Sequence, residues 1–589
     1  MAGMIPLNRL GVLILLISPV LFFDQNALEA KEPIERELLH KQAVFVLEIQ
    51  EPLAWADHPV LERVWKPLSK SRQLKAGLVT PEFGRVLAAR DYLQAAIGQD
   101  WQQAIAELTA GGVWVAATPK PNERLTIVVT AKNADSWKRL EAAATLTLKA
   151  QNRDLPPSTI YREIKTYRAA GADLAFAGRR LLIASQESDL KRMIDQLLEH
   201  AEPEKIETGG TQSAQPSLNL AIDLKAVRRA PDFQKALVRP SDDAGQIAIL
   251  GGWMDLLKAA DRLRFKLSWP AGSEEIQATL TADDAAANEV LAGFFAGGPD
   301  RKIAPLLEPA GTIYTASWFR DYAALWNSRA DLLTESALEK LEEGDQKIKQ
   351  QFSVFGVSFT PSELFKQLGT EFRVVLVRSG DSEYRVELKN RLPAAAVCIS
   401  LRDRDAFLAQ AEPLSRALGL VAAFGEAKML SKTSEHAEAK LKGLWFRDDE
   451  NAVRQGNQIR YNFNPTWTVA REHFILGSTR KIVAQVIDEL DRHSAGLKTA
   501  ANVLQPTERQ RLSFSELACG LMDFREAILQ SSVLERGLTY SDSIIELDLA
   551  KDAIEALGRL TTEAAFTEQG LEYQIRLDPE RARQNDMPK

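Results

Sequence analysis

Two stretches of the sequence, far apart in the chain, share one pattern and decide the predicted fold. Residues 181–185 (LLIAS) and 474–478 (FILGS) each precede a helical pattern, over residues 187–200 and 480–493. Each stretch alternates apolar side chains as a strand does and changes to helical spacing just after its final serine. Since serine favours the position before a helix, that serine is predicted to be the N-cap in both stretches.

Other segments of the two halves match in the same order. These pairs are 44–49 with 313–318, 112–116 with 370–375, 125–129 with 395–399, 259–263 with 556–560, and 275–280 with 572–577. The offset between matched residues changes along the chain, as expected if the second half carries longer loops. We therefore predict one domain copy at 42–297, a linker with three prolines at 298–310, a second copy at 311–580, and a polar tail at 581–589.

Short strand pairs and long helices are both predicted in each half. Residues 175–177 and 181–184 flank Gly178-Arg179 and predict a tight hairpin, whereas 82–108 and 332–351 predict long exposed helices. Consecutive hairpins favour antiparallel sheets with helices on one side. The predicted fold class is therefore α+β, in two degenerate copies of a mixed helix and mainly antiparallel-sheet domain. The polar, glycine-containing residues 204–217 predict a surface loop.

The order of these elements resembles a known kind of protein. An apolar opening strand, helices, a strand of the GGV type (residues 111–115), a hairpin strand and the LLIAS strand with its helix follow one another. In this order the chain resembles exported bacterial proteins of unknown function built from a duplicated α+β domain. The resemblance implies an exported α+β protein and assigns no catalytic residue.

The N-terminal residues 1–30 are typical of a secretory signal peptide. Arg9 precedes the apolar run 10–23, which is shorter than the roughly 18 residues that span a bilayer, and Ala30 offers a cleavage point. We expect an exported protein, periplasmic or extracellular, with no stable membrane span after cleavage. The alternative is a protein anchored by an uncleaved N-terminal segment.

The composition is that of a globular protein with a mild acidic balance. The chain has 589 residues, of which 26% are charged, and its net charge is -7. No basic excess is available to attract phosphates, so nucleic-acid binding is not expected.

Familiar catalytic and metal-binding motifs are missing from the sequence. The six histidines form no H-E-x-x-H pair, and neither a glycine-rich phosphate loop nor a G-x-S-x-G elbow occurs. His200 and His493 end corresponding helical stretches, where a cation is favoured by exposed carbonyls. The acidic clusters at 403–405 and 448–450 lack the calcium-loop pattern. We therefore predict no catalytic, cofactor-binding or metal-binding residues, and no cofactor.

Two S-x-x-K matches come closest to a catalytic motif: Ser188 with Lys191, and Ser478 with Lys481. In serine acyl-transferases such a lysine lies one helical turn from the serine and helps to activate it. The matches are not equivalent under the repeat, because Ser188 aligns with Lys481, and the accompanying S-D-N and K-T-G signatures are missing. Ser188 is predicted to face water and Ser478 to accept a backbone N–H at a helix start, so neither is predicted to be a nucleophile.

The cysteines and tryptophans admit structural interpretations. Cys398 and Cys519 are the only cysteines, and export permits a disulfide between them. The repeat aligns them with Val128 and Lys225, so the fold does not require a bridge, and Cys398 is interpreted as a buried thiol. Three tryptophans lie among core-patterned residues and are predicted to pack inside rather than to stack on sugars: Trp114, Trp137 and Trp269.

These observations favour an exported, non-enzymatic binding or scaffolding protein of the cell envelope, whose partner is an unidentified envelope protein or ligand. The alternative is an envelope hydrolase with a dispersed active site, because catalytic groups often meet only in the fold.

Overall fold

The computed structural model describes most of the chain. The described residues are 34–39, 43–52, 54, 58–72, 75, 80–118, 123–150, 156–169, 171–200, 217–229, 260–269, 274–283, 303–353, 360–380, 383–385, 388, 390–424, 429–447, 459–496, 506–567 and 570–579. Residues 1–30, 204–216, 448–450 and 581–589, which hold the predicted signal peptide, almost all of the predicted loop, one acidic cluster and the predicted tail, lie outside them.

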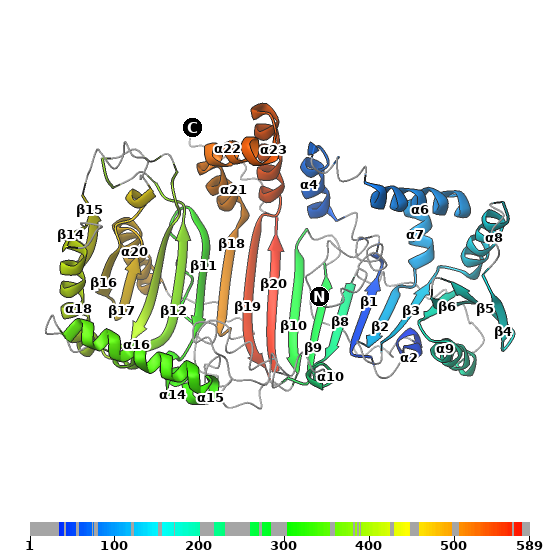
Figure 1. Cartoon of the computed structure of the whole chain (residues 1–589), viewed down its shortest axis with the longest axis horizontal. Coiled ribbons are helices and arrows are strands. Elements are labelled where there is room, and N and C mark those ends of the chain that lie inside the picture. Colours follow the sequence, from blue (N-terminus) through cyan, green and yellow to red (C-terminus); the bar gives the residue numbers. More distant parts are fainter. Residues whose placement is uncertain are drawn as a thin grey trace. The chain divides into compact units, whose positions relative to one another are not determined.

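The chain divides into two compact units. Among the described residues, unit 1 contains those up to Arg229, those from Asp261 to Thr281, and Gln574–Pro579, and unit 2 contains the others. Both units combine antiparallel strand pairs with helices (Figure 1), and the predicted α+β class is confirmed.

In unit 1 the opening strand β1 (Phe45–Gln50) pairs antiparallel with β2 (Val113–Thr118) on one side and with β8 (Ser217–Asp223) on the other. Beyond β2 the order is β3 (Arg124–Thr130), β7 (Arg180–Ala184), β6 (Ala172–Ala177), β5 (Ile164–Ala169) and β4 (Ser158–Tyr161). Beyond β8 come β9 (Arg262–Ser268) and β10 (Ile276–Asp283). The pairing of Ala177 with Arg180 confirms the predicted hairpin.

In unit 2 the opening strand β11 (Thr312–Phe319) likewise pairs antiparallel with β12 (Leu368–Val377) and β18 (Glu508–Ser513). Beyond β12 the order is β13 (Ala394–Leu401), β17 (His473–Gly477), β16 (Thr466–Ala470), β15 (Ala439–Phe446) and β14 (Met429–His436). Beyond β18 come β19 (Arg559–Thr567) and then β20 (Gly570–Asp578), of which residues 570–573 belong to unit 2. The strands of the two units therefore pair in the same order.

The helices of the two units also follow corresponding strands. Unit 1 has α2 (Ile34–Leu38), α4 (Pro59–Leu68), α6 (Pro81–Ile97), α7 (Trp101–Thr109), α8 (Ala134–Ala150), α9 (Glu187–Glu199) and α10 (Leu224–Arg229). Unit 2 has α14 (Tyr322–Asn327), α15 (Arg329–Leu332), α16 (Glu335–Ser353), α17 (Pro361–Gln367), α18 (Arg404–Phe424), α20 (Arg480–Gly496), α21 (Phe514–Asp523), α22 (Arg525–Arg536) and α23 (Tyr540–Glu555). Thus α8 and α18 follow β3 and β13, and α9 and α20 follow β7 and β17.

Helices cover both faces of the central strands, so the prediction of helices on one side only is wrong. In unit 2, Cys398 packs with Ile482 of α20, whereas its neighbour Ile399 packs with Phe407 of α18. Successive residues of a strand point to opposite faces, and β13 is apolar at nearly every position, so both faces need a cover. Unit 1 repeats the arrangement with α9 on one face and with α7 and α8 on the other.

The serines that follow β7 and β17 form hydrogen bonds to neighbouring strands rather than to the helices. Ser185 Oγ accepts the backbone N–H of Leu125 at 3.0 Å, and Ser478 Oγ accepts that of Ala395 at 2.9 Å. The predicted N-caps are therefore wrong. Thr479 caps α20, because its Oγ1 accepts the N–H of Ile482 at 3.3 Å, and the residue before α9 makes no capping bond with its side chain. Each serine lies one residue earlier, where it extends the strand pairing.

Two predicted segments differ in detail. The predicted helix 82–108 is broken into α6 and α7, because Gly98 adopts a positive φ of 74° and Asp100 caps α7. In the predicted linker, residues 303–309 form neither helix nor strand, but Leu307 is buried in the core beneath α20. This described part of the linker therefore belongs to the packing of unit 2.

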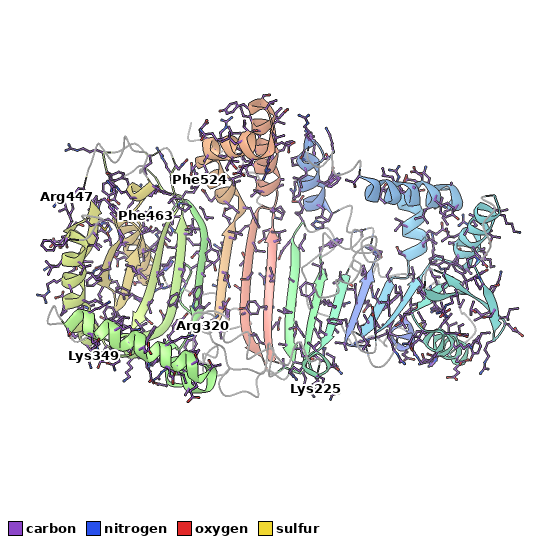
Figure 2. The ribbon with its side chains drawn as sticks, viewed as in Figure 1. Lys225, Arg320, Lys349, Arg447, Phe463 and Phe524 are labelled. Carbon is purple, nitrogen blue, oxygen red and sulfur yellow. The ribbon has the colours of Figure 1, made fainter. Side chains whose placement is uncertain are left out.

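A buried ion pair lies at the end of β11. The guanidinium of Arg320, labelled in Figure 2, contacts the carboxylate of Glu508, and both side chains are at least nine-tenths buried. Burial, and secondarily the charge of Glu508, raises the pKa of Tyr314 to about 12. Trp318 stacks on Phe372 at 5.1 Å between ring centres beside this pair.

Candidate functional site

A pocket of about 620 Å³ lies at the start of α20 in unit 2. Its wall combines the residues that follow β12, the start of β13, the first turns of α20 and one residue of α21. The polar lining residues are Arg378, Ser379, Arg391, Thr479, Lys481, Gln485 and Glu516. Three of these are basic and one is acidic, so the wall carries a positive excess of two charges.

Three polar side chains of this pocket are unpartnered. Ser379, Lys481 and Gln485 line the pocket, and their side chains form no hydrogen bond or ion pair among the described residues. The ammonium of Lys481 lies over Gly380, since a Cβ added at Gly380 would come within 2.7 Å of Nζ. Unused donors that converge on one open pocket are the arrangement expected of a binding site.

Arg378 is held in a fixed orientation at the pocket wall. Its Nε and Nη2 donate to the two carboxylate oxygens of Asp523, each at 3.2 Å, and Glu516 lies 3.7 Å away. The hydrogen bond to Asp523 raises the pKa of Arg378, which therefore stays charged. Because Asp523 already fixes the guanidinium, ligand binding would cost little further side-chain entropy at Arg378.

The first backbone N–H groups of α20 are hydrogen-bonded to side chains of the protein. The backbone N–H groups of Arg480 and Lys481 donate to Asn464 Oδ1 and Glu383 Oε1, at 2.6 and 2.8 Å. Glu383 also accepts from Arg480 Nε at 2.9 Å, which balances its charge. The pocket therefore offers side chains to a ligand, whereas the first helical amides are already used.

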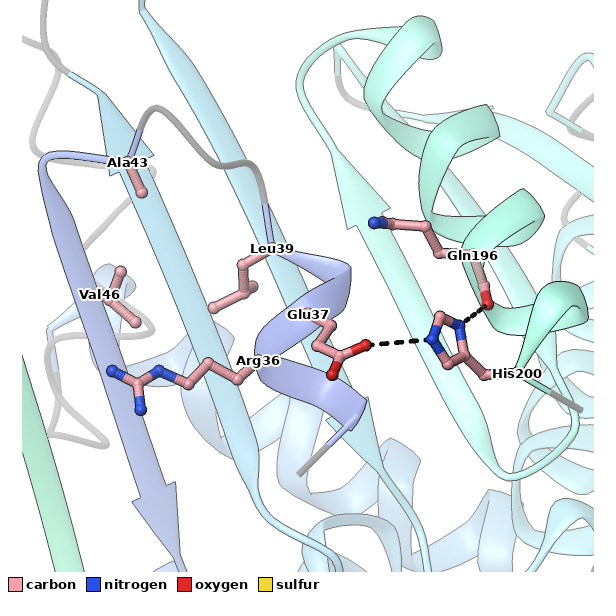
Figure 3. Close-up of a pocket in the computed structure, with 7 residues that line it drawn as sticks. All are labelled: Arg36, Glu37, Leu39, Ala43, Val46, Gln196 and His200. Atoms are coloured by element: carbon pink, nitrogen blue, oxygen red, sulfur yellow. Dashed lines mark hydrogen bonds and ion pairs between the residues drawn. The ribbon is translucent and has the colours of Figure 1, made fainter. Parts of the chain in front are cut away.

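A second pocket, of about 420 Å³, lies in unit 1 between α2, β1 and the end of α9 (Figure 3). His200 faces acceptors with both ring nitrogens: Nε2 lies 3.3 Å from Glu37 Oε2, and Nδ1 lies 2.8 Å from the carbonyl oxygen of Gln196. The side-chain oxygen of Gln196 accepts from Arg192 at 2.6 Å. These groups hold α2 against α9, so this pocket has less free bonding capacity than the one beside α20.

The side chains of the two S-x-x-K matches make other contacts than the motif requires. Ser188 is exposed, as predicted, and Lys191 pairs with Glu187 at 2.7 Å. Ser478 accepts a backbone N–H, as predicted, although from strand β13, and Lys481 instead points over Gly380. Neither serine has its hydroxyl within hydrogen-bonding reach of its lysine among the described residues.

Two histidines, one cysteine and three tryptophans considered in the sequence analysis lie at helix ends or in the core. His200 is the C-cap of α9, as its predicted place at a helix end implies, and burial lowers the pKa of His493 in the last turn of α20. The described residues contain no group of three side chains that could hold a metal ion. Cys398 is fully buried, as predicted, and is a free thiol like Cys519. The three tryptophans predicted to lie in the core are buried: Trp114, Trp137 and Trp269.

Comparisons with known proteins assign no family to the chain. No protein-family model matches it, and a search of curated proteins finds no significant match. Among solved structures, "Structure of crystal form I of TP0453" matches with 12% identity over 43% of this chain and 79% of that chain, at a TM-score of 0.22. A TM-score this low supports no inference about fold or function. No helix within the described ranges has the length and apolar character needed to cross a membrane.

Proposed function

We propose that the chain is an exported, non-enzymatic binding protein of the cell envelope. The observation that carries the proposal is the open pocket beside α20, where the side chains of Ser379, Lys481 and Gln485 make no hydrogen bond or ion pair among the described residues. Such a wall can recognise a ligand through hydrogen bonds and charge. Export rests on the signal-peptide pattern of residues 1–30.

We further propose that the binding protein consists of two copies of one domain, at 42–297 and 311–580. The shared order of strand pairing supports this proposal, as does the register. Thr126 opposes Ala184 in unit 1, and the matched residues Ala396 and Gly477 oppose each other in unit 2. The strand-end serines also make the same hydrogen bond in both units.

The rival function, a hydrolase, has one feature in its favour. Ser379 and Lys481 line the same pocket, and a serine with a nearby amine is a known nucleophile and base. However, no hydrogen bond joins these two side chains, whereas a general base acts on a hydroxyl whose oxygen lies about 2.6–3.2 Å away or is reached through one water. The geometry therefore favours binding.

The proposal is tested by filling the pocket. The mature chain is heated with a panel of neutral, cationic and anionic small molecules, and the unfolding temperature is recorded for wild type and for Gly380→Leu. The matched control is Gly344→Leu, because a side chain at Gly344 on α16 meets nothing within 4 Å. We expect at least one compound to stabilise wild type and the control and to leave Gly380→Leu unchanged.

Several results would contradict this function. If no compound stabilises wild type, or if Gly380→Leu responds as wild type does, the pocket is not a binding site. Covalent labelling of Ser379 by a fluorophosphonate probe would identify a nucleophile and replace binding with hydrolysis. N-terminal sequencing of the cell-derived protein tests export separately, with a start near Lys31 expected and an intact Met1 in the cytoplasm contradicting it.

A further inference from the structure

We propose that the pocket beside α20 takes a small organic anion of charge −1 or −2, such as a phosphate monoester or a dicarboxylate. This inference rests on the proposed binding function and specifies its ligand. It is drawn from the charges of the wall, the free donors within it and the apolar residues beside them.

The charge of the wall sets the charge of the ligand. Arg378, Arg391 and Lys481 outnumber Glu516 by two. Asp523, which holds Arg378 from behind, reduces the local excess to one. Glu383 and Arg480 neutralise each other at the helix start. The wall and Asp523 together carry an excess of one positive charge, and the ammonium of Lys481 makes no ion pair among the described residues, so an anionic head group would balance it.

The donors define what the anionic head must be. The Lys481 ammonium, the Ser379 hydroxyl and the Gln485 amide are unpartnered among the described residues, and all three can donate to oxygen. A phosphoryl or carboxylate group presents several acceptor oxygens, so it can accept from these donors together. The same positive charge would repel a cationic ligand.

The remaining wall and the volume indicate an organic body on the ligand. Val377, Ala394 and Ile482 line the pocket beside the donors, each with at most 8% of its surface exposed, so they form an apolar floor. The volume of about 620 Å³ is within the range of small-molecule pockets and exceeds what a bare inorganic ion needs. The ligand is therefore expected to carry carbon atoms that contact this apolar side.

The two proposed domain copies differ at this position. Under the proposed alignment Lys481 corresponds to Ser188, which is exposed on α9 and uncharged. Only unit 2 thus carries the free ammonium. We expect one bound anion per chain.

The test is isothermal titration of the mature chain with glycerol 3-phosphate and with succinate, and with glycerol as the neutral analogue. Lys481→Gln is compared with Lys347→Gln, a control in which an exposed lysine of α16 is neutralised. We expect at least one anion to bind at a ratio of one per chain, glycerol not to bind, and Lys481→Gln to weaken binding by about tenfold or more, the loss for one charged hydrogen bond. Lys481→Arg should retain part of the affinity.

Each outcome has a defined meaning. If phosphate monoester and dicarboxylate differ, the tighter one identifies the head group. Equal binding of glycerol, no loss in Lys481→Gln, or an affinity that does not fall with added salt would overturn the anion assignment. If neutral molecules bind and Gly380→Leu abolishes their binding, the anion inference fails while the binding function stands. If nothing binds in either experiment, both fail.

Discussion

Replacing Ser478 by alanine tests whether the strand-end serines have the structural role assigned to them. Ser478 Oγ accepts the N–H of Ala395 at 2.9 Å, and Ser185 Oγ accepts that of Leu125 at 3.0 Å. Alanine removes the acceptor and leaves the strand N–H without a partner. The cost of such an unsatisfied group is about 1–3 kcal/mol. A helix cap lost at this residue would cost about 1 kcal/mol, but the structure gives that role to Thr479.

The assay is urea unfolding of the chain, in which the transitions of wild type, Ser478→Ala and Ser185→Ala are compared. At a slope of about 2 kcal/mol per molar, a loss of 1–3 kcal/mol lowers the midpoint of the affected transition by about 0.5–1.5 M. Hydrogen exchange of the Ala395 amide should accelerate in Ser478→Ala, because its side-chain acceptor has been removed. Ser185→Ala should have the same effect on the Leu125 amide.

Ser188→Ala is the matched control, because Ser188 is exposed on α9. We expect that variant to change stability by no more than about 0.5 kcal/mol. If Ser478→Ala unfolds at the same urea concentration as Ser188→Ala, the hydrogen bond to Ala395 contributes nothing and the structural role is refuted. If only one of the two strand-end variants is destabilised, the two serines are not equivalent.

Three further predictions concern buried groups. Glu508→Gln should destabilise unit 2 by about 3–5 kcal/mol, because it removes the charge of the buried carboxylate that contacts Arg320. Glu343→Gln in an exposed pair should cost less than about 1 kcal/mol, and equal urea midpoints for the two variants would refute this. Burial raises the pKa of Cys398 to about 11, so iodoacetamide at pH 8 should label this thiol only after unfolding, and rapid labelling of the native chain would show that it is accessible. Burial lowers the pKa of His58, whose Nδ1 accepts an N–H at the start of α4, so the folded state favours the neutral ring. The contribution of the neutral ring to the free energy of unfolding is therefore complete above about pH 6.5 and is lost as the pH falls below that value. Urea unfolding at several pH values should show this loss in wild type and a smaller one in His58→Asn, and identical pH profiles would contradict it.

The sequence was sufficient to predict the strands over LLIAS and FILGS and the helices that follow them, because apolar periodicity reports directly on strands and helices. It was less informative about side-chain partners. The serines of LLIAS and FILGS have the composition of N-caps, yet their hydroxyls reach sideways to Leu125 and Ala395 on neighbouring strands. Which of two nearby N–H groups a serine accepts from depends on sheet register, and a single sequence does not contain that register.

The pocket beside α20 was not predicted. Its wall brings together residues from the end of β12, the start of β13 and the first turns of α20, segments that no local spacing connects. The sequence did single out Lys481, but as the partner of Ser478 in an S-x-x-K match. The lysine side chain instead lies over Gly380, because the chain after β12 passes beside the helix start. The proximity of Lys481 to Gly380 therefore follows from the fold and not from the sequence spacing.

The claim on which the account rests most heavily is that one α+β domain occurs twice in the chain. An experimentally determined structure of that chain tests it most directly. The account predicts that residues 42–297 superpose on 311–580 as one fold, with Ser185 on Ser478 and Trp269 near Phe566. Strand orders that differ between the two segments, or α9 and α20 following strands that are not equivalent, would contradict it.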